Sequence, residues 1–236
     1  VLAAGPLQEK LGIIAYPAAA EADMVARDIN LLKDYPKARY HVLHGSAQET
    51  LGLVSAAKEQ GLQGTCEVTP HHLWFSSDEI RDNCTAFKMN PPLRGKSDRQ
   101  ALRRGLADGI IDFVATDHAP HEASAKGQSF KTSAFGTTGL ETSLRVLLTL
   151  VREGVMSPER LVQVFSSQPA RFLGIDQEIG DISPDRPMAA VLVNRRSSGV
   201  VTDDDLFSLS KNSCFLGEKL DGKIEAVFLA DRYYQF

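Results

Sequence analysis

Hydrophobic and polar positions along the chain follow two different periods. In some stretches the apolar residues recur every three or four positions, which is typical of a helix with one buried face. In others they form short runs, which indicate buried strands. The predicted helices cover residues 20–35, 48–60, 97–107 and 140–153, and the predicted strands cover residues 40–44, 64–69 and the run that begins at Ile111.

Residues that end a helix stand where the period changes. Pro36 comes just after the first predicted helix, and Gly61, Gly109 and Gly154 follow the next three. Glycine adopts the left-handed backbone that commonly ends a helix, and proline cannot continue one. Ser157, with proline next to it, predicts the start of a further helix, because serine caps a first turn and proline fits into it.

The alternation of strands with helices predicts parallel β/α units, arranged either as a TIM-type barrel or as a doubly wound sheet. Polar side chains follow the predicted strands, and in both folds ligands bind at the carboxyl ends of strands. After about residue 176 the pattern changes to short strand-like runs at residues 188–193 and 224–229. We therefore expect β/α units over residues 1–176 and a separate small β region over residues 177–236.

Composition limits the class of protein and its partners. The chain has 236 residues, of which 43% are apolar, so it can bury a sizeable core. Its formal net charge is −4 without a basic patch, which argues against nucleic acid and favours a small molecule or a protein as partner. Three cysteines without a CxxC spacing argue against a disulfide framework. Finding neither an apolar run long enough for a membrane span nor a signal-peptide pattern, we expect a cytoplasmic protein.

The sequence IIDFVATDHAPH carries an apolar strand directly into Asp117, which His118 and His121 follow. Histidine nitrogens and aspartate oxygens are ligands for divalent metals such as zinc. An aspartate beside a metal-bound water can also take its proton, because the metal lowers the pKa of that water from about 15.7 toward about 7. The alternative is that Asp117 caps a turn and both histidines are exposed loop residues. The spacing alone leaves both interpretations open.

The other histidines are weaker candidates when each is taken alone. His41 and His44 stand three positions apart in one predicted strand, so their side chains point to opposite faces and only one can reach a shared site. His71 and His72 follow a predicted strand and a proline. Either could be a ligand or a buried structural residue.

Two loops could hold a polar ligand. In the sequence NPPLR, two prolines stiffen the chain between Asn90 and Arg94; Asn90 could bond an amide edge and Arg94 could pair with a carboxylate. An ordinary surface turn fits the same residues. Residues 134–139, AFGTTG, offer flexible backbone amides before a predicted helix and could form an anion cradle.

Taken together, these segments resemble one family in order and wording. The strings HVLHGS, EVTPHHL, NPPLR, TDHAPH, AFGTTGLET and SKNSCFLGEKLDGKI are similar to those of the bacterial-type dihydroorotases of the amidohydrolase superfamily. The resemblance implies a TIM-type (β/α)8 barrel with a small β-sandwich and a site for one or two Zn²⁺ ions. It also implies reversible hydrolysis of the cyclic amide of dihydroorotate to carbamoyl aspartate in pyrimidine synthesis.

The resemblance also implies roles for individual residues. His44 matches a histidine that binds the metal, and Asp117 matches the aspartate that is both a metal ligand and the general base and acid. His121 and Asn90 match residues that hold the substrate. The backbone at Ala134, Phe135 and Gly136 matches the loop that meets the pyrimidine ring.

The metal centre of the family needs further ligands, among them an HxH pair on the first strand, and this sequence contains no HxH. We therefore expect the chain to supply only the later β/α units of the barrel and part of the β-sandwich. Two hypotheses remain open. The chain is part of a zinc-dependent dihydroorotase, or it is a non-catalytic scaffold that binds aspartate transcarbamoylase. A hydantoinase or allantoinase is a third alternative, and a homodimer is an assembly that each of these allows.

Overall fold

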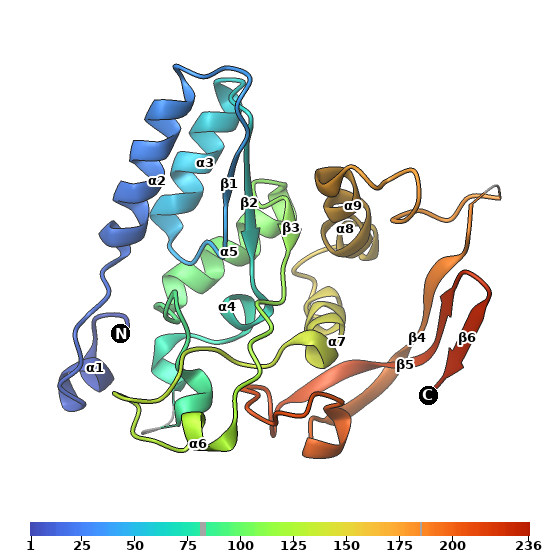
Figure 1. Cartoon of the computed structure of the whole chain (residues 1–236). Coiled ribbons are helices and arrows are strands. Elements are labelled where there is room, and N and C mark those ends of the chain that lie inside the picture. The colour runs from blue at the N-terminus through green and yellow to red at the C-terminus, as the bar shows by residue number, and fades with distance from the viewer. Residues whose placement is uncertain (81–83, 185) are drawn as a thin grey trace. The chain divides into compact units, whose positions relative to one another are not determined.

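Figure 1 shows the chain as a computed structural model, which describes residues 1–80, 84–184 and 186–236. Within these ranges the chain forms two compact units. One unit consists of Val1–Leu140 and Leu206–Cys214, and the other of Glu141–Asp205 and Phe215–Phe236. The polypeptide thus returns once to the first unit before it completes the second. These bounds differ from the division expected after residue 176, which stays a prediction.

The first unit contains a parallel sheet of three strands. They are β1 (Tyr40–Val42), β2 (Gly64–Val68) and β3 (Phe113–Val114), hydrogen-bonded in that order. In the register of the sheet, Val42 lies opposite Cys66 and Val68 lies opposite Val114. Because the strands are parallel, their carboxyl ends lie at one edge of the sheet. The β2 strand lies between the other two.

Helices connect these strands, as the alternation of periods predicted. The helix α2 (Ala18–Leu32) precedes β1, α3 (Gln48–Glu59) connects β1 to β2, and α5 (Lys96–Asp108) precedes β3 (Figure 1). The α3 helix packs against both α2 and α5. The shorter elements of this unit are α1 (Pro6–Lys10), α4 (Pro70–Trp74), α6 (Ala123–Lys126) and the 3-10 turns η1 (Ser77–Glu79) and η2 (Thr85–Phe87).

Apolar side chains fill the contact between α3 and α5. Leu51 and Val54 on α3 and Leu102 and Leu106 on α5 are all buried. Burial of each such side chain contributes about 1.5–3 kcal/mol to folding. Gly105 lets the helices approach closely, since a Cβ atom at this position would lie 3.0 Å from Cδ1 of Leu51.

The second unit combines helices with an antiparallel sheet. Its helical part contains α7 (Leu140–Arg152), whose first residue belongs to the first unit, followed by α8 (Pro158–Val162), the π-helical turn η3 (Gln163–Ser167) and α9 (Gln168–Leu173). Its sheet has the order β4 (Ala189–Val200), β5 (Lys219–Leu229) and β6 (Arg232–Gln235), and the 3-10 turn η4 (Asp203–Asp205) follows β4. The strand-like runs predicted near residues 188–193 and 224–229 thus lie in or beside β4 and β5.

The strands of the first unit are shorter than the sequence predicted. The strand expected over residues 40–44 ends at Val42, and the strand expected from Ile111 consists of Phe113–Val114. His44 and Asp117 have left-handed backbones, with φ of 51° and 47°. A β-strand does not contain this conformation, so neither strand extends to its polar residue.

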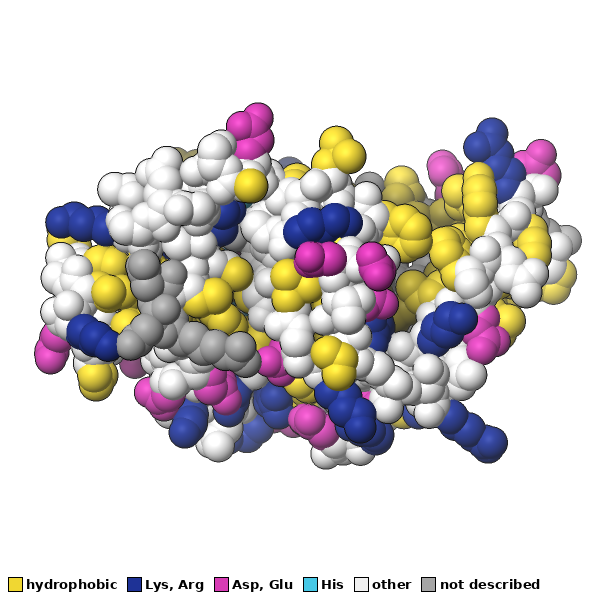
Figure 2. Space-filling model, turned by 90° about the horizontal axis from the view of Figure 1, so that it is seen from below, with side chains coloured by type: hydrophobic (Ala, Val, Ile, Leu, Met, Phe, Trp, Pro, Cys, Tyr) yellow, Lys and Arg dark blue, Asp and Glu magenta, His cyan; other side chains and the backbone are white. Residues whose placement is uncertain are grey.

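In the part of the chain that the structure describes, none of the helices combines the length and the apolar composition needed to cross a bilayer. Figure 2 shows one face of the molecule, on which Lys and Arg side chains are interspersed with Asp and Glu side chains. Charges of both signs share this face.

Candidate active site

The carboxyl ends of β1 and β3 bring His44 and Asp117 together. His44 lies two residues beyond Val42, and Asp117 lies three residues beyond Val114. Nε2 of His44 is 3.5 Å from Oδ1 of Asp117, and both side chains are partly exposed, by 24% and 30%. The two residues that the sequence indicated as metal ligands are therefore neighbours at one edge of the sheet.

The backbones of His44 and Asp117 are both left-handed, a conformation that usually favours glycine. In a residue with a side chain it costs about 1–3 kcal/mol and persists only where the surrounding structure enforces it. Such residues cluster at functional sites. At each of these residues the chain turns away from the direction of its strand. The two side chains lie next to each other at the edge of the sheet.

Glu67, near the end of β2, contacts the ring nitrogen of His44 that does not face Asp117. Its Oε1 atom is 2.6 Å from Nδ1 of His44, and its Oε2 atom is 3.2 Å from Nε2 of His41. Glu67 is buried. A carboxylate at Nδ1 favours a proton on that nitrogen, and the lone pair of Nε2 then faces Asp117.

The charges of this group influence one another. Burial raises the pKa of Glu67, but the contacts with His41 and His44 outweigh it and lower the pKa to about 2. The contact with Glu67 raises the pKa of His44 above its usual value, against the effect of burial. Burial raises the pKa of Asp117, and the charge of His44 partly offsets this. Glu67 is therefore the fixed negative charge of the group.

A second loop lies against His121. Nε2 of His121 is 2.6 Å from the carbonyl oxygen of Phe135, which accepts a hydrogen bond from the ring. Gly136 has φ of 118°, and a Cβ atom there would lie 2.4 Å from Cβ of Ala119, so this position requires glycine. The structure thus brings His121 together with Ala134, Phe135 and Gly136, the backbone segment that the sequence indicated as substrate-binding.

Two buried lysines also bind this loop. Nζ of Lys126 donates to the carbonyl oxygens of Ala134 and Gly136, at 3.0 and 2.9 Å, and Nζ of Lys88 donates to that of Ser133 at 2.6 Å. Burial, followed by repulsion from Lys88, lowers the pKa of Lys126 to about 8. The backbone N–H groups of Ala134 and Gly136 donate within the protein. Among the N–H groups of residues 134–136, that of Phe135 makes no hydrogen bond with a described residue.

Arg94 pairs with a carboxylate of the protein itself. Its Nη2 atom lies 3.3 Å from Oε2 of Glu21, and its Nε atom donates to Oγ of Ser46 at 2.8 Å. Arg94 and Glu21 are both buried. The guanidinium group that could have gripped a ligand therefore supports the turn that carries His44.

Asn90 begins the loop of residues 90–94, which follows β2 in the sequence. Asn90 is exposed, and its peptide bond to Pro91 is cis. Among the described residues, no hydrogen bond or ion pair joins Asn90 to His44 or Asp117. The carbonyl oxygen of Pro91 accepts a hydrogen bond of 3.1 Å from Nε2 of His72, which fixes this loop to the end of β2.

Residues 25–231 match the model of the amidohydrolase family, which is most of the chain. The chain belongs to this family. Its curated relatives include proteins named dihydroorotase from Wolbachia sp. subsp. Drosophila simulans, with 39% identity over 220 residues, and from Ehrlichia chaffeensis, with 40% identity over 220 residues. Each alignment covers 93% of this chain and 49% of the relative. This amidohydrolase chain therefore spans about half the length of the curated relatives that it matches.

Solved structures of hydantoinases have the same fold. An L-hydantoinase (dihydropyrimidinase) from Arthrobacter aurescens superposes with a TM-score of 0.85 and 28% identity, over 90% of this chain and 48% of that one. A D-hydantoinase (dihydropyrimidinase) from Thermus sp. superposes with a TM-score of 0.84 over 97% of this chain and 51% of that one; at 24% identity it shows the fold alone.

Proteins of the amidohydrolase family generally use metal ions, and the donors at the strand ends fit one. Two ligands at about 2.0–2.1 Å from one tetrahedral zinc ion lie about 3.3–3.4 Å from each other. The distance of 3.5 Å between Nε2 of His44 and Oδ1 of Asp117 is close to this separation. A complete site is not formed within the described residues, where no group of three or more His, Cys, Asp or Glu residues could hold a metal ion.

His118 and His72 form hydrogen bonds within the fold of this amidohydrolase. Nδ1 of His118 accepts hydrogen bonds from the backbone N–H groups of Gly139 and Leu140, at 3.1 and 3.3 Å, and so caps the start of α7. The ring nitrogens of His72 contact the Thr69 hydroxyl at 2.7 Å and the Pro91 carbonyl. Burial lowers the pKa of His72 to about 4. His72 is therefore neutral and uses both nitrogens within the fold.

Glu67 is the residue of this site that the sequence analysis missed. A signal was present, since GTCEV places a charged residue in a strand whose last three residues are buried. Acidic side chains are almost never fully buried without a partner. A buried strand glutamate between two other strands therefore predicts a cationic or hydrogen-bonding neighbour at the same edge of the sheet.

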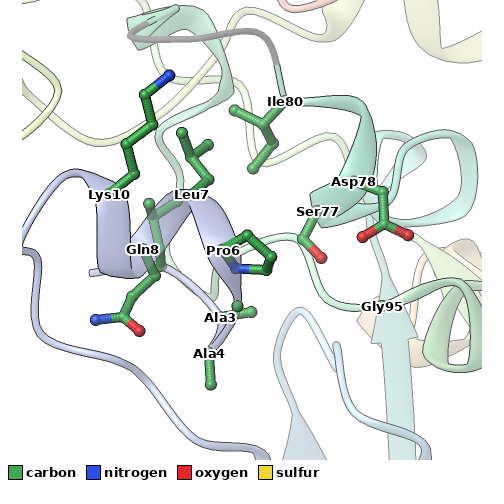
Figure 3. Close-up of a pocket in the computed structure, with 12 residues that line it drawn as sticks. Ala3, Ala4, Pro6, Leu7, Gln8, Lys10, Ser77, Asp78, Ile80 and Gly95 are labelled. Atoms are coloured by element: carbon green, nitrogen blue, oxygen red, sulfur yellow. The ribbon is translucent and has the colours of Figure 1, made fainter.

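A separate cavity of about 500 Å³ lies between α1 and η1 (Figure 3). Its lining combines apolar groups such as Pro6, Leu7 and Ile80 with the polar side chains of Ser77 and Asp78. None of the residues that line it belongs to the candidate active site.

Proposed function

We propose that the protein containing this chain is a zinc-dependent cyclic amide hydrolase that interconverts dihydroorotate and carbamoyl aspartate in pyrimidine synthesis. The observation that carries the proposal is the contact of 3.5 Å between Nε2 of His44 and Oδ1 of Asp117, with Glu67 at the opposite nitrogen of the ring. The names of the curated relatives support the choice of substrate.

The proposal includes the architecture of the whole protein. The three parallel strands and their helices would form part of a TIM-type (β/α)8 barrel, whose other units, together with the remaining metal ligands, lie outside this chain. The antiparallel sheet of β4, β5 and β6 would form part of a small β-sandwich. The support for this is that the chain spans about half the length of the relatives that it matches.

In the hydrolytic direction, Asp117 would accept a proton from a water molecule as the water oxygen bonds to the ring carbonyl carbon. The same carboxyl group would then return the proton to the ring nitrogen as the carbon–nitrogen bond breaks, which yields a carboxyl and a ureido group. Zinc, when bound, lowers the pKa of a coordinated water toward about 7. Burial raises the pKa of Asp117, which makes its carboxylate a better proton acceptor.

His121, Asn90 and the loop of Ala134, Phe135 and Gly136 would hold the substrate. The N–H of Phe135, which has no hydrogen-bond partner among the described residues, is the group of this loop best suited to bond a ring carbonyl. The neighbouring N–H groups and carbonyls already have partners within the protein. The carbonyl of Phe135 is bonded to His121, so the loop and the imidazole would act together.

The test is an assay of the full-length protein for hydrolysis of dihydroorotate and for ring closure of carbamoyl aspartate. We expect Asp117→Asn to lower kcat by about 10²–10⁴-fold, the usual contribution of a general acid or base. Asp108→Asn makes the same chemical change at an exposed position at the end of α5 and serves as the control. Equal rates for Asp117→Asn and the parent protein would refute the proposal.

A second candidate function is hydrolysis of hydantoins or dihydropyrimidines, which the likeness to the Arthrobacter aurescens L-hydantoinase favours. The same assay with hydantoin and dihydrouracil separates the two, because the preferred ring is the one with the higher kcat/KM. A complex with aspartate transcarbamoylase stays a prediction, and so does the hypothesis that this chain is a non-catalytic scaffold within that complex. A homodimer also stays a prediction. Co-purification and the mass of the native protein in solution test them.

A further inference from the structure

The chain returns to the first unit through residues 206–214, which lie between β4 and β5 in the sequence. The amide group of Asn212 connects this segment to two loops. Its Nδ2 atom donates to the carbonyl oxygens of Ala119, at 3.1 Å, and Gly136, at 3.3 Å. Its Oδ1 atom accepts from the backbone N–H of His121 at 3.1 Å.

Further hydrogen bonds reinforce the same connection. Oγ of Ser210 donates to the carbonyl oxygen of His121 at 2.6 Å and also contacts Oδ1 of Asn212. The carbonyl oxygen of Asn212 accepts from the backbone N–H of Thr138 and from Oγ1 of Thr137, both at 3.1 Å. One short segment thus bonds to the loop that carries Asp117 and His121 and to the loop that carries Gly136.

The chemistry of the position requires an amide. A primary amide presents N–H donors and a carbonyl acceptor on one planar group. An aspartate would keep the acceptor for the His121 N–H but would place a negative oxygen against the carbonyl oxygens of Ala119 and Gly136. An alanine would leave all three backbone groups without this partner.

Asn212 also borders a cavity of about 850 Å³, which His121 and Lys126 line as well. Small-molecule sites commonly have volumes of about 300–1,000 Å³. Asn212 therefore lies where a change in loop spacing would alter both the cavity and the distance between His121 and the backbone of residues 134–136.

We propose that Asn212 is a positioning residue for substrate binding, which fixes the spacing between the loop of Asp117 and His121 and the loop of residues 134–136. Among the described residues it makes no hydrogen bond with Asp117 or His44, and it acts through the backbone of His121 and Gly136. The inference rests on the proposed function, since the ligand of these loops is taken to be a cyclic amide.

The test measures kcat, KM and metal content of the full-length protein with Asn212→Ala, Asn212→Asp and Ser210→Ala. We expect KM to rise by about 10–100-fold in both Asn212 variants, because small displacements of substrate-positioning groups have effects of this size. The expected rise is smaller for Ser210→Ala, which leaves the amide in place. Metal content is expected to stay unchanged. Asn30→Ala, an exposed position on α2, is the matched control.

Hydrogen exchange of the ligand-free protein gives a readout that needs no activity. We expect the backbone amide of His121, which loses its acceptor Oδ1, to exchange faster in Asn212→Ala, while the amides of α3 keep their rates. An unchanged KM in both Asn212 variants would overturn the inference, and so would a parallel loss of kcat, metal and thermal stability. A parent protein that hydrolyses no cyclic amide, yet shows the exchange difference, would refute the proposed function and leave the loop connection established.

Discussion

Nδ1 of His44 lies 2.6 Å from Oε1 of Glu67, on the other side of the ring from the nitrogen that faces Asp117. Carboxylates in this position orient a metal-binding imidazole and raise its basicity, and their loss typically lowers metal affinity by about 10–100-fold. If the site binds zinc as proposed, Glu67 would support metal binding through His44 although it is not itself one of the expected ligands.

We therefore expect Glu67→Gln to weaken binding of zinc to the full-length protein by about 10–100-fold. The amide keeps the shape of the side chain but removes the charge that favours a proton on Nδ1. Titration of the metal-free protein with zinc measures the change. Glu178→Gln makes the same substitution at an exposed position of the second unit, whose own sequence contains no histidine. Equal zinc affinity for Glu67→Gln and Glu178→Gln would contradict the role.

The buried carboxylate of Glu21 predicts a pH dependence of stability. Burial raises its pKa, but hydrogen bonds from Ser46, Thr50 and the backbone of Ala47 outweigh this and lower the pKa below 4.5. A carboxyl group with a lower pKa in the folded state stabilises the protein above its unfolded pKa, and this stabilisation is lost as the pH falls through the folded value.

We expect Glu21→Gln to lower the free energy of unfolding at pH 7 by about 2–4 kcal/mol, because the buried guanidinium of Arg94 loses its counter-charge. Below pH 4.5 the difference between the parent protein and the variant should shrink. Denaturant unfolding at pH 7, 5 and 4 measures it. A difference that stays constant over this range would show that the charge of Glu21 is not responsible.

Gly136 allows a direct test of whether the loop of residues 134–136 binds the substrate, as proposed. In Gly136→Ala the new Cβ would lie 2.4 Å from Cβ of Ala119, at a φ that side chains rarely adopt. We expect KM to rise by about tenfold or more as the loop shifts. Adding Ala119→Gly removes the overlap and should restore part of the affinity, since the unfavourable backbone remains.

Gly52→Ala is the control for that experiment. Gly52 lies inside α3 with no atom near the position of a new Cβ, so alanine there should be neutral or stabilise the helix by about 0.5–1 kcal/mol. If Gly136→Ala leaves KM as unchanged as Gly52→Ala does, the loop has no part in substrate binding.

Periodicity along the sequence predicted the β/α order of the first unit and the strand-like runs of the second. Burial of one face of a helix or strand requires apolar residues at regular intervals, and these intervals are visible in the sequence. Periodicity could not predict that β1 stops at Val42, since the left-handed turn at His44 depends on neighbours from other strands. The same apolar run that predicted the strand from Ile111 also predicted that Asp117 follows its end.

The environment of the candidate site was harder to predict, because it depends on pairs far apart in the sequence. Arg94 pairs with Glu21, 73 positions earlier in the sequence, and so is bonded within the protein. Glu67 and His44 meet across two strands. Asn212 follows the whole of β4 and still bonds to the loop of His121. Hydrogen bonds of this kind leave no periodic trace, so sequence patterns alone do not predict them.

The return of residues 206–214 to the first unit has a consequence for recombination between related enzymes. A crossover placed between the loop of residues 134–138 and this segment would combine the native loop with a segment 206–214 from another protein, whose residue at position 212 need not make the same hydrogen bonds. Chimaeras that exchange residues 117–138 together with 206–214 keep both ends of the connection. The residues that join these two loops are therefore discontinuous in the sequence, although hydrogen bonds hold them together in the folded first unit.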